Sequence, residues 1–185
     1  MNIPNFITLI RILLVPGIVT CIAYANNTQQ NLKLCAFLLF IVAIITDGLD
    51  GYIARRFNLK TQLGTFLDPF ADKLLLVSCF VAISLSSAYL IKPPAWIIII
   101  IVFRELVLVC GLLILFFTTN KMTIRPNYFG KITTVLQMIA VIMLLGQWHI
   151  TEYLWYILAI VTSASGLIYV FRDLKQMNSN GKHLA

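Results

Sequence analysis

Long apolar stretches follow one another along this chain and are separated by short polar segments. Six of them have about the 17–25 residues that a helix needs to cross the hydrocarbon layer of a membrane. They cover residues 5–25, 32–54, 64–86, 94–118, 129–148 and 152–171. Because the connections are short, consecutive helices should run antiparallel in one bundle. The pattern predicts an all-α integral membrane protein with six transmembrane helices.

The composition indicates that lipid, rather than water, surrounds most of this protein. Hydrophobic residues make up 60% of the 185 residues and charged residues only 11%, whereas a soluble domain carries about 25% charged residues. No repeat or linker divides the chain, so we expect a single domain over 1–171 and a short tail over 172–185. The four cysteines have neither paired nor metal-binding spacing, and we expect them to be small buried side chains without disulfides.

Lysine and arginine are unevenly distributed between the connecting segments. They follow the second span, the fourth span and the sixth span, whereas the opposite connections hold almost none. The positive-inside rule then places the amino terminus and the tail in the cytoplasm. We therefore expect a multi-pass protein of the cell membrane. Its net charge of +7 is explained by this topology and by attraction to anionic lipid, and no nucleic-acid partner is indicated.

Four of the seven acidic residues gather at the facing ends of the second and third spans. They are Asp47, Asp50, Asp68 and Asp72. A charged side chain at the bilayer centre costs about 2.5–3.5 kcal/mol on insertion scales, so such residues usually mark a site. The spacings i, i+3 and i, i+4 place each pair on one helix face. Four converging carboxylates suit Mg²⁺ or Mn²⁺, as one ion or two, and zinc is not indicated because Cys and His are lacking there.

Small and basic residues surround these aspartates. Gly48, Gly51 and Gly64 could allow close helix packing or the approach of a ligand, and beside four aspartates the ligand is favoured. Arg55 can bind phosphate or anchor its helix at the interface. Metal-bridged phosphates require cations around an acidic centre. The further candidate cations are Arg11, Lys73, Arg104, Arg125 and Lys131.

The acidic segment has a recognisable signature. Residues 47–72 read DGLDGYIARRFNLKTQLGTFLDPFAD. This resembles the signature of the CDP-alcohol phosphotransferase family, D-x2-D-G-x2-A-R-x8-G-x3-D-x3-D. Every specified position matches, namely Asp47, Asp50, Gly51, Ala54, Arg55, Gly64, Asp68 and Asp72. The resemblance covers nearly the whole chain and implies a six-transmembrane-helix bundle of the CDP-alcohol phosphotransferase type.

The resemblance also implies a reaction, the transfer of a phosphatidyl group from CDP-diacylglycerol to a small alcohol. Two divalent ions, Mg²⁺ or Mn²⁺, would be held by Asp47, Asp50, Asp68 and Asp72. The CDP-lipid would be bound by Asp47, Gly51, Ala54, Arg55, Gly64 and Asp68. Asp72 would take the proton from the acceptor hydroxyl, which attacks the lipid-side phosphorus and expels CMP. Membrane lipids are expected partners, and the family resemblance implies a homodimer.

Two further segments point to the acceptor. The sequences NIPNFITLIRILLVP and RPNYFGKITT resemble the branch of the family that makes phosphatidylglycerol phosphate. This resemblance implies glycerol 3-phosphate as the acceptor, bound in an active site that faces the cytoplasm. The candidate residues for its phosphate are Thr8, Arg11, Arg104, Arg125 and Lys131. Arg104 could equally pair with its neighbour Glu105 or with another helix.

Alternatives remain open at the level of the sequence. The same metal site could serve another acceptor, such as serine, inositol phosphate or phosphatidylglycerol. A small cation channel or transporter could also use four acidic side chains. It would need a polar path through both halves of the bilayer, and the last three spans lack one in their outer halves. A structural or scaffolding role would leave the converging aspartates without a purpose.

Overall fold

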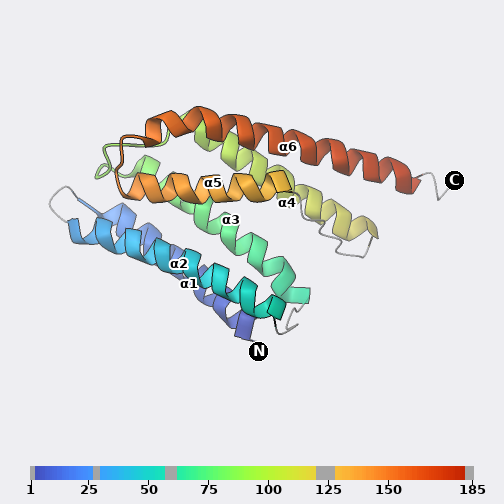
Figure 1. Cartoon of the computed structure of the whole chain (residues 1–185), viewed down its shortest axis with the longest axis horizontal. Coiled ribbons are helices and arrows are strands. Elements are labelled where there is room, and N and C mark those ends of the chain that lie inside the picture. The colour runs from blue at the N-terminus through green and yellow to red at the C-terminus, as the bar shows by residue number, and fades with distance from the viewer. Residues whose placement is uncertain (1–2, 27–29, 57–61, 120–127, 182–185) are drawn as a thin grey trace. The chain divides into compact units, whose positions relative to one another are not determined.

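The fold is described from a computed structural model of the chain. The backbone is described for residues 3–26, 30–56, 62–119 and 128–181. The side chains and their contacts are described for residues 8–26, 30–48, 70–111 and 129–169. Within these ranges there are six α-helices and no strand (Figure 1). They are α1 (Ile3–Tyr24), α2 (Gln30–Arg56), α3 (Gln62–Leu85), α4 (Ala95–Thr119), α5 (Tyr128–Leu145) and α6 (Thr151–Gly181). The prediction of an all-α chain with six helices is confirmed for this part of the chain.

Most helix ends lie within a few residues of the predicted spans, and α6 is the exception. This helix continues past residue 171 to Gly181, into the segment that was predicted to be a tail. Neither proline nor glycine occurs between Gly166 and Gly181, and good helix formers such as Lys175 and Gln176 follow the apolar part. The prediction followed the apolar stretch and therefore missed the polar extension of this helix.

Two helical segments among the described residues are both long and apolar enough to cross a membrane. Gln30–Gly48 has a mean hydropathy of 1.8, and Thr151–Tyr169 has a mean hydropathy of 1.2. Thr8–Tyr24 and Phe129–Leu145 are shorter apolar helices. Six crossings and two cytoplasmic termini remain predictions.

The chain forms two compact units. The first contains Met1–Pro94 and Met138–Glu152, and the second contains Ala95–Gln137 and Tyr153–Ala185. In the first unit α1 packs against both α2 and α3. This unit contains the described part of the aspartate motif. A single domain over 1–171 remains a prediction.

One face of α1 is buried along its described length. Its buried residues recur every three or four positions, which is the repeat of one helix face, and they are Thr8, Arg11, Val15, Ile18 and Ile22. Three of these side chains are apolar, and the two nearest the amino end are polar. The helix therefore carries Thr8 and Arg11 into the interior by the same periodicity that buries its apolar residues.

An aspartate lies in line with the buried apolar side chains of α2, and another lies in line with those of α3. Their buried side chains include Ala36, Phe40, Ala43, Ala71, Leu75, Cys79 and Phe80. Asp47 follows Ala43 by four positions, and Asp72 precedes Leu75 by three. Both aspartates thus continue an apolar helix face, one at the carboxyl part of α2 and the other in the amino half of α3.

The connection between α3 and α4 is held by side-chain hydrogen bonds. Gln147 Oε1 accepts bonds from the backbone N–H groups of Leu90 at 2.7 Å and Ile91 at 3.0 Å. Lys33 Nζ donates to the carbonyl oxygen of Ala88 at 2.6 Å. Gln147 has a φ of 54°, which is unusual for a residue with a side chain. These contacts fix the end of α3 that lies away from Asp72.

The cysteines differ in exposure. Cys79 is buried, Cys21 is intermediate, and Cys35 and Cys110 are exposed. The prediction that all four are buried is wrong for Cys35 and Cys110, because both lie on helix faces that the other described residues leave exposed, and Cys21 is only partly buried. Cys21 on α1 and Cys35 on α2 place their Sγ atoms 3.7 Å apart.

Candidate active site

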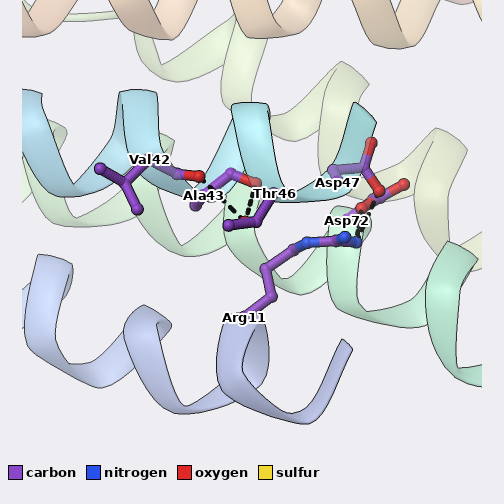
Figure 2. A network of polar contacts seen from close by, with 6 residues as sticks. All are labelled: Arg11, Val42, Ala43, Thr46, Asp47 and Asp72. Atoms are coloured by element: carbon purple, nitrogen blue, oxygen red, sulfur yellow. Dashed lines mark hydrogen bonds and ion pairs between the residues drawn. The ribbon is translucent and has the colours of Figure 1, made fainter. Parts of the chain in front are cut away.

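Three helices meet at one buried cation. Nη1 of Arg11 lies 2.7 Å from Oδ1 of Asp47 and 2.8 Å from Oδ1 of Asp72. Arg11 comes from α1, Asp47 from α2 and Asp72 from α3. Figure 2 shows both carboxylates directed at the end of the guanidinium. The packing of α1 against α2 and α3 therefore assembles a charged centre from residues far apart in the sequence.

The three side chains differ in their access to solvent. The Arg11 side chain is completely buried, whereas 30% of the Asp47 side chain and 23% of the Asp72 side chain are exposed. Burial of the guanidinium strengthens its attraction to both carboxylates, because little water screens the charges. The partial exposure of the carboxylates leaves them reachable by a ligand. Thr8, one turn before Arg11, is also buried.

Thr46, next to Asp47, uses its hydroxyl within its own helix. The hydroxyl lies 2.9 Å from the carbonyl oxygens of both Val42 and Ala43 (Figure 2). Bonds of this kind satisfy a hydroxyl inside an apolar helix. The donor of Thr46 is therefore directed back along α2, while the neighbouring Asp47 is directed toward Arg11.

The other motif residues can be placed on their helices. Asp50 lies with Asp47 in α2, and Asp68 lies with Asp72 in α3. As predicted, each pair has helical spacing and shares a helix face. Gly51, Ala54 and Arg55 also lie in α2, and Gly64 lies in α3. The side chains of these six motif residues lie outside the described residues, so their roles stay predictions.

The two described carboxylates suit a divalent cation. Two oxygens from different helices contact the same cationic nitrogen, so the backbone already holds them around one positive charge. Mg²⁺ and Mn²⁺ prefer carboxylate oxygens. Among the described residues there is no group of three or more acidic, His or Cys side chains that could hold a metal. A complete ligand set would need Asp50 and Asp68.

Gly48 lies beside this centre on an exposed part of α2. A Cβ atom added to Gly48 would meet no atom of the described residues within 4 Å. Close helix packing through this glycine therefore has no support in the described part of the chain. The space fits the expectation that a ligand approaches α2 next to Asp47.

Arg104, in the second unit, forms a salt bridge and a hydrogen bond with residues of the same unit. It forms a salt bridge with Glu105, and its Nη2 donates a 3.1 Å hydrogen bond to Ser165 Oγ on α6. The side chains of Arg104 and Glu105 are both buried. Of the roles considered from the sequence, pairing with a neighbour and pairing with another helix are both present. Binding of acceptor phosphate by Arg104 stays a prediction.

The other residues predicted to bind the acceptor phosphate belong to different units or lie outside the described residues. Thr8 and Arg11 belong to the first unit, whereas Lys131 is exposed on α5 in the second unit. Arg125 lies outside the described residues. Among the described residues, Arg11 is a candidate in direct contact with Asp47 and Asp72.

The residues that contact Arg104 on other helices were not predicted from the sequence. Ser165 accepts its hydrogen bond, and Cβ atoms added to Gly130 and Gly166 would each lie 3.5 Å from its side chain. Small and polar residues on apolar helices could have signalled this site, because such residues let membrane helices approach closely. The pairing of Arg11 with Asp47 and Asp72 was also missed, although Arg11 lies on the buried face of α1.

The comparisons with known proteins agree with the motif. The sequence profile of CDP-alcohol phosphatidyltransferases matches residues 1–167. A protein of Escherichia coli (strain K12) named CDP-diacylglycerol–glycerol-3-phosphate 3-phosphatidyltransferase is 34% identical over 180 residues, which cover 91% of this chain and 93% of the relative. A Bacillus subtilis (strain 168) protein of the same name is 40% identical over 154 residues, covering 78% and 76%.

A third relative extends the match to almost the whole chain. It comes from Mycobacterium tuberculosis (strain ATCC 25618 / H37Rv) and is named probable phosphatidylglycerophosphate synthase. It is 31% identical over 182 residues, which cover 95% of this chain and 83% of the relative. The family profile, these relatives and the complete aspartate motif all agree, and the chain belongs to the CDP-alcohol phosphatidyltransferase family.

Proposed function

We propose that this protein transfers the phosphatidyl group of CDP-diacylglycerol to glycerol 3-phosphate, giving phosphatidylglycerol phosphate and CMP. The names of relatives that match most of the chain support this donor and this acceptor. The observation that carries the proposal is the convergence of Asp47 and Asp72 on one cationic atom, Nη1 of Arg11. It places two motif carboxylates from different helices around one positive charge, as is needed to hold a divalent ion for phosphoryl-group transfer.

We place the metal site at the aspartates. The family generally depends on a divalent metal ion. Asp47 and Asp72 would hold such an ion together with Asp50 and Asp68, and we propose two ions, either Mg²⁺ or Mn²⁺. When bound, the metal would neutralise charge on the diphosphate and on the oxygens that attack and leave.

Proton transfer and substrate binding would be carried out by different residues of the chain. Asp72 would accept the proton of the acceptor hydroxyl; the new bond joins that oxygen to the lipid-side phosphorus, and the bond from this phosphorus to CMP breaks. The exposed fraction of Asp72 leaves room for this contact. We assign the CDP-lipid to Asp47, Gly51, Ala54, Arg55, Gly64 and Asp68, and the acceptor phosphate to Thr8, Arg11, Arg104, Arg125 and Lys131.

The membrane fixes where this reaction takes place. CDP-diacylglycerol is held in a bilayer by its acyl chains, while glycerol 3-phosphate is water-soluble, so the site must lie where both can reach it. We propose a multi-pass protein of the cell membrane, with the aspartates near its cytoplasmic surface and with a homodimer as the working form. The distribution of Lys and Arg between the connections supports this orientation.

The test is a panel of single acceptors given to the purified full-length protein in detergent. CDP-diacylglycerol would be supplied with Mg²⁺ or Mn²⁺ and with glycerol 3-phosphate, serine, inositol phosphate or phosphatidylglycerol, and CMP and the lipid product would be quantified. We expect metal-dependent CMP release with glycerol 3-phosphate only. Release with a different acceptor would keep the reaction class and overturn the proposed substrate. No release with any acceptor, from protein shown to be folded, would contradict the proposed function.

A further inference from the structure

Arg11 occupies the position from which a cation would bind both described carboxylates. Its Nη1 atom contacts Oδ1 of Asp47 and Oδ1 of Asp72, and both contacts end at this one nitrogen. The separation of the two oxygens is therefore no larger than the sum of the two contact distances. An ion coordinated by both of these Oδ1 atoms would need the position between them that Nη1 of Arg11 now occupies.

The burial of Arg11 makes these contacts important for the fold. Its side chain has no exposed surface, and a buried charge is costly unless another charge pairs with it. The two carboxylates in turn repel each other when no cation lies between them. Arg11 thus neutralises part of the negative charge and ties α1 to α2 and α3 through the same atoms.

We propose that Arg11 is a built-in counter-cation that competes with the divalent metal for Asp47 and Asp72. Without metal, the guanidinium holds the two carboxylates and the three helices together. A divalent ion held by both Oδ1 atoms would displace the guanidinium from them, because two cations cannot occupy the same position. It keeps its charge and can then contact a phosphate oxygen. This inference rests on the proposed metal site and adds a role that binding of acceptor phosphate alone does not give to Arg11.

The proposal predicts a gain of metal affinity when the arginine is removed. We expect Arg11→Met to lower the Kd for Mn²⁺ by about tenfold, because one positive charge in contact with the ligands is lost even where solvent screens part of it. The same variant loses the counter-cation and should unfold at a lower temperature in EDTA. Saturating Mn²⁺ should restore much of this loss, because the stabilisation by a ligand grows with the logarithm of its concentration relative to its Kd.

The experiment uses the full-length protein in detergent, with Mn²⁺ alone as the probe. Mn²⁺ binding is measured by electron paramagnetic resonance, and Tm is measured in EDTA and in saturating Mn²⁺. Lys33→Met is the matched control, because Lys33 on α2 is also a cation of the first unit but donates its hydrogen bond to the carbonyl oxygen of Ala88. It should lower Tm equally in EDTA and in Mn²⁺ and leave the Kd for Mn²⁺ unchanged.

Arg11→Lys keeps the proposal testable if the methionine variant does not fold. A lysine retains the charge but lacks the planar fork of the guanidinium, so the Kd should fall by less than in Arg11→Met. An unchanged or higher Kd in a folded Arg11 variant would overturn the competition. Failure of the parent to bind Mn²⁺ would overturn it at an earlier point, by removing the metal site of the proposed function.

Discussion

Asp72 and Arg11 are 61 positions apart in the chain, yet Nη1 of the arginine donates a 2.8 Å hydrogen bond to Oδ1 of the aspartate. The same nitrogen contacts Asp47 on a third helix. The aspartate motif spans only α2 and α3, so α1 completes the charged centre from outside the motif. A substitution on α1 should therefore alter the chemistry of residues that it does not adjoin in the sequence.

The Arg11–Asp72 contact can be measured by a double-mutant cycle on stability. Arg11→Met and Asp72→Asn should each lower the free energy of unfolding in EDTA, and the double variant should lose less than the two single losses combined. We expect a coupling of about 1–2 kcal/mol, below that of a fully buried pair because Asp72 is partly exposed. The control cycle pairs Arg11→Met with Glu152→Gln, an exposed carboxylate on α6. Equal couplings in the two cycles would contradict a specific contact.

The hydrogen bond between Arg104 and Ser165 should stabilise the second unit. Ser165→Ala removes the acceptor of the guanidinium and should lower the free energy of unfolding by about 1 kcal/mol. Arg104→Met should cost about 2–4 kcal/mol, because the buried Glu105 also loses its cation. Ser163→Ala is the matched control, since Ser163 is exposed on the same helix. A loss at Ser163 as large as at Ser165 would argue against this bond.

Gln147 should control hydrogen exchange in the connection before α4. Its side-chain oxygen accepts bonds from the amides of Leu90 and Ile91, and its Nε2 donates to Leu144 O at 2.7 Å. Gln147→Ala should speed exchange at both amides and cost about 2 kcal/mol of stability. Gln147→Glu keeps an acceptor but loses the donor, so protection at Leu90 and Ile91 should persist better. If both variants left exchange at these amides unchanged, the contact would not exist in solution.

Helix packing places two cysteines within reach of each other. The Sγ atoms of Cys21 and Cys35 are 3.7 Å apart, so copper–phenanthroline should join them in a disulfide within one chain, with loss of two protons and two electrons to the oxidant. Peptide mass spectrometry after digestion identifies the link between α1 and α2. Cys35→Ser should abolish it and Cys110→Ser should not. Formation of only intermolecular links would contradict the packing of α1 on α2.

The helices were predictable because each has an apolar run of membrane-spanning length. The end of α2 and the beginning of α3 lie within a few residues of the predicted spans, so the spans correctly placed Asp47 and Asp72 on two consecutive helices. The far end of α6 was missed, because beyond residue 171 the helix continues through polar residues that lack the apolar signal. Hydropathy follows contact with lipid rather than the helical backbone itself.

The partners of the buried arginines could not be predicted from spacing. Arg11 and Arg104 both interrupt apolar helices, and both were predicted from the sequence to bind the acceptor phosphate. The structure pairs Arg11 with carboxylates on two other helices and pairs Arg104 with its neighbour and a serine on α6. The partner of each arginine depends on which helix faces pack together. The periodicity of residues along a single helix does not reveal this packing.

We propose that Asp47 and Asp72 belong to a metal site that supports phosphatidyl transfer. The most direct test measures Mn²⁺ binding and CMP release in the same preparations of the parent, Asp47→Asn, Asp72→Asn and Glu152→Gln. We expect both aspartate variants to weaken Mn²⁺ binding and to lose at least about a thousandfold in CMP release with glycerol 3-phosphate, while Glu152→Gln behaves like the parent. Folded Asp47→Asn and Asp72→Asn proteins that bind Mn²⁺ and release CMP at the parental rate would contradict the claim.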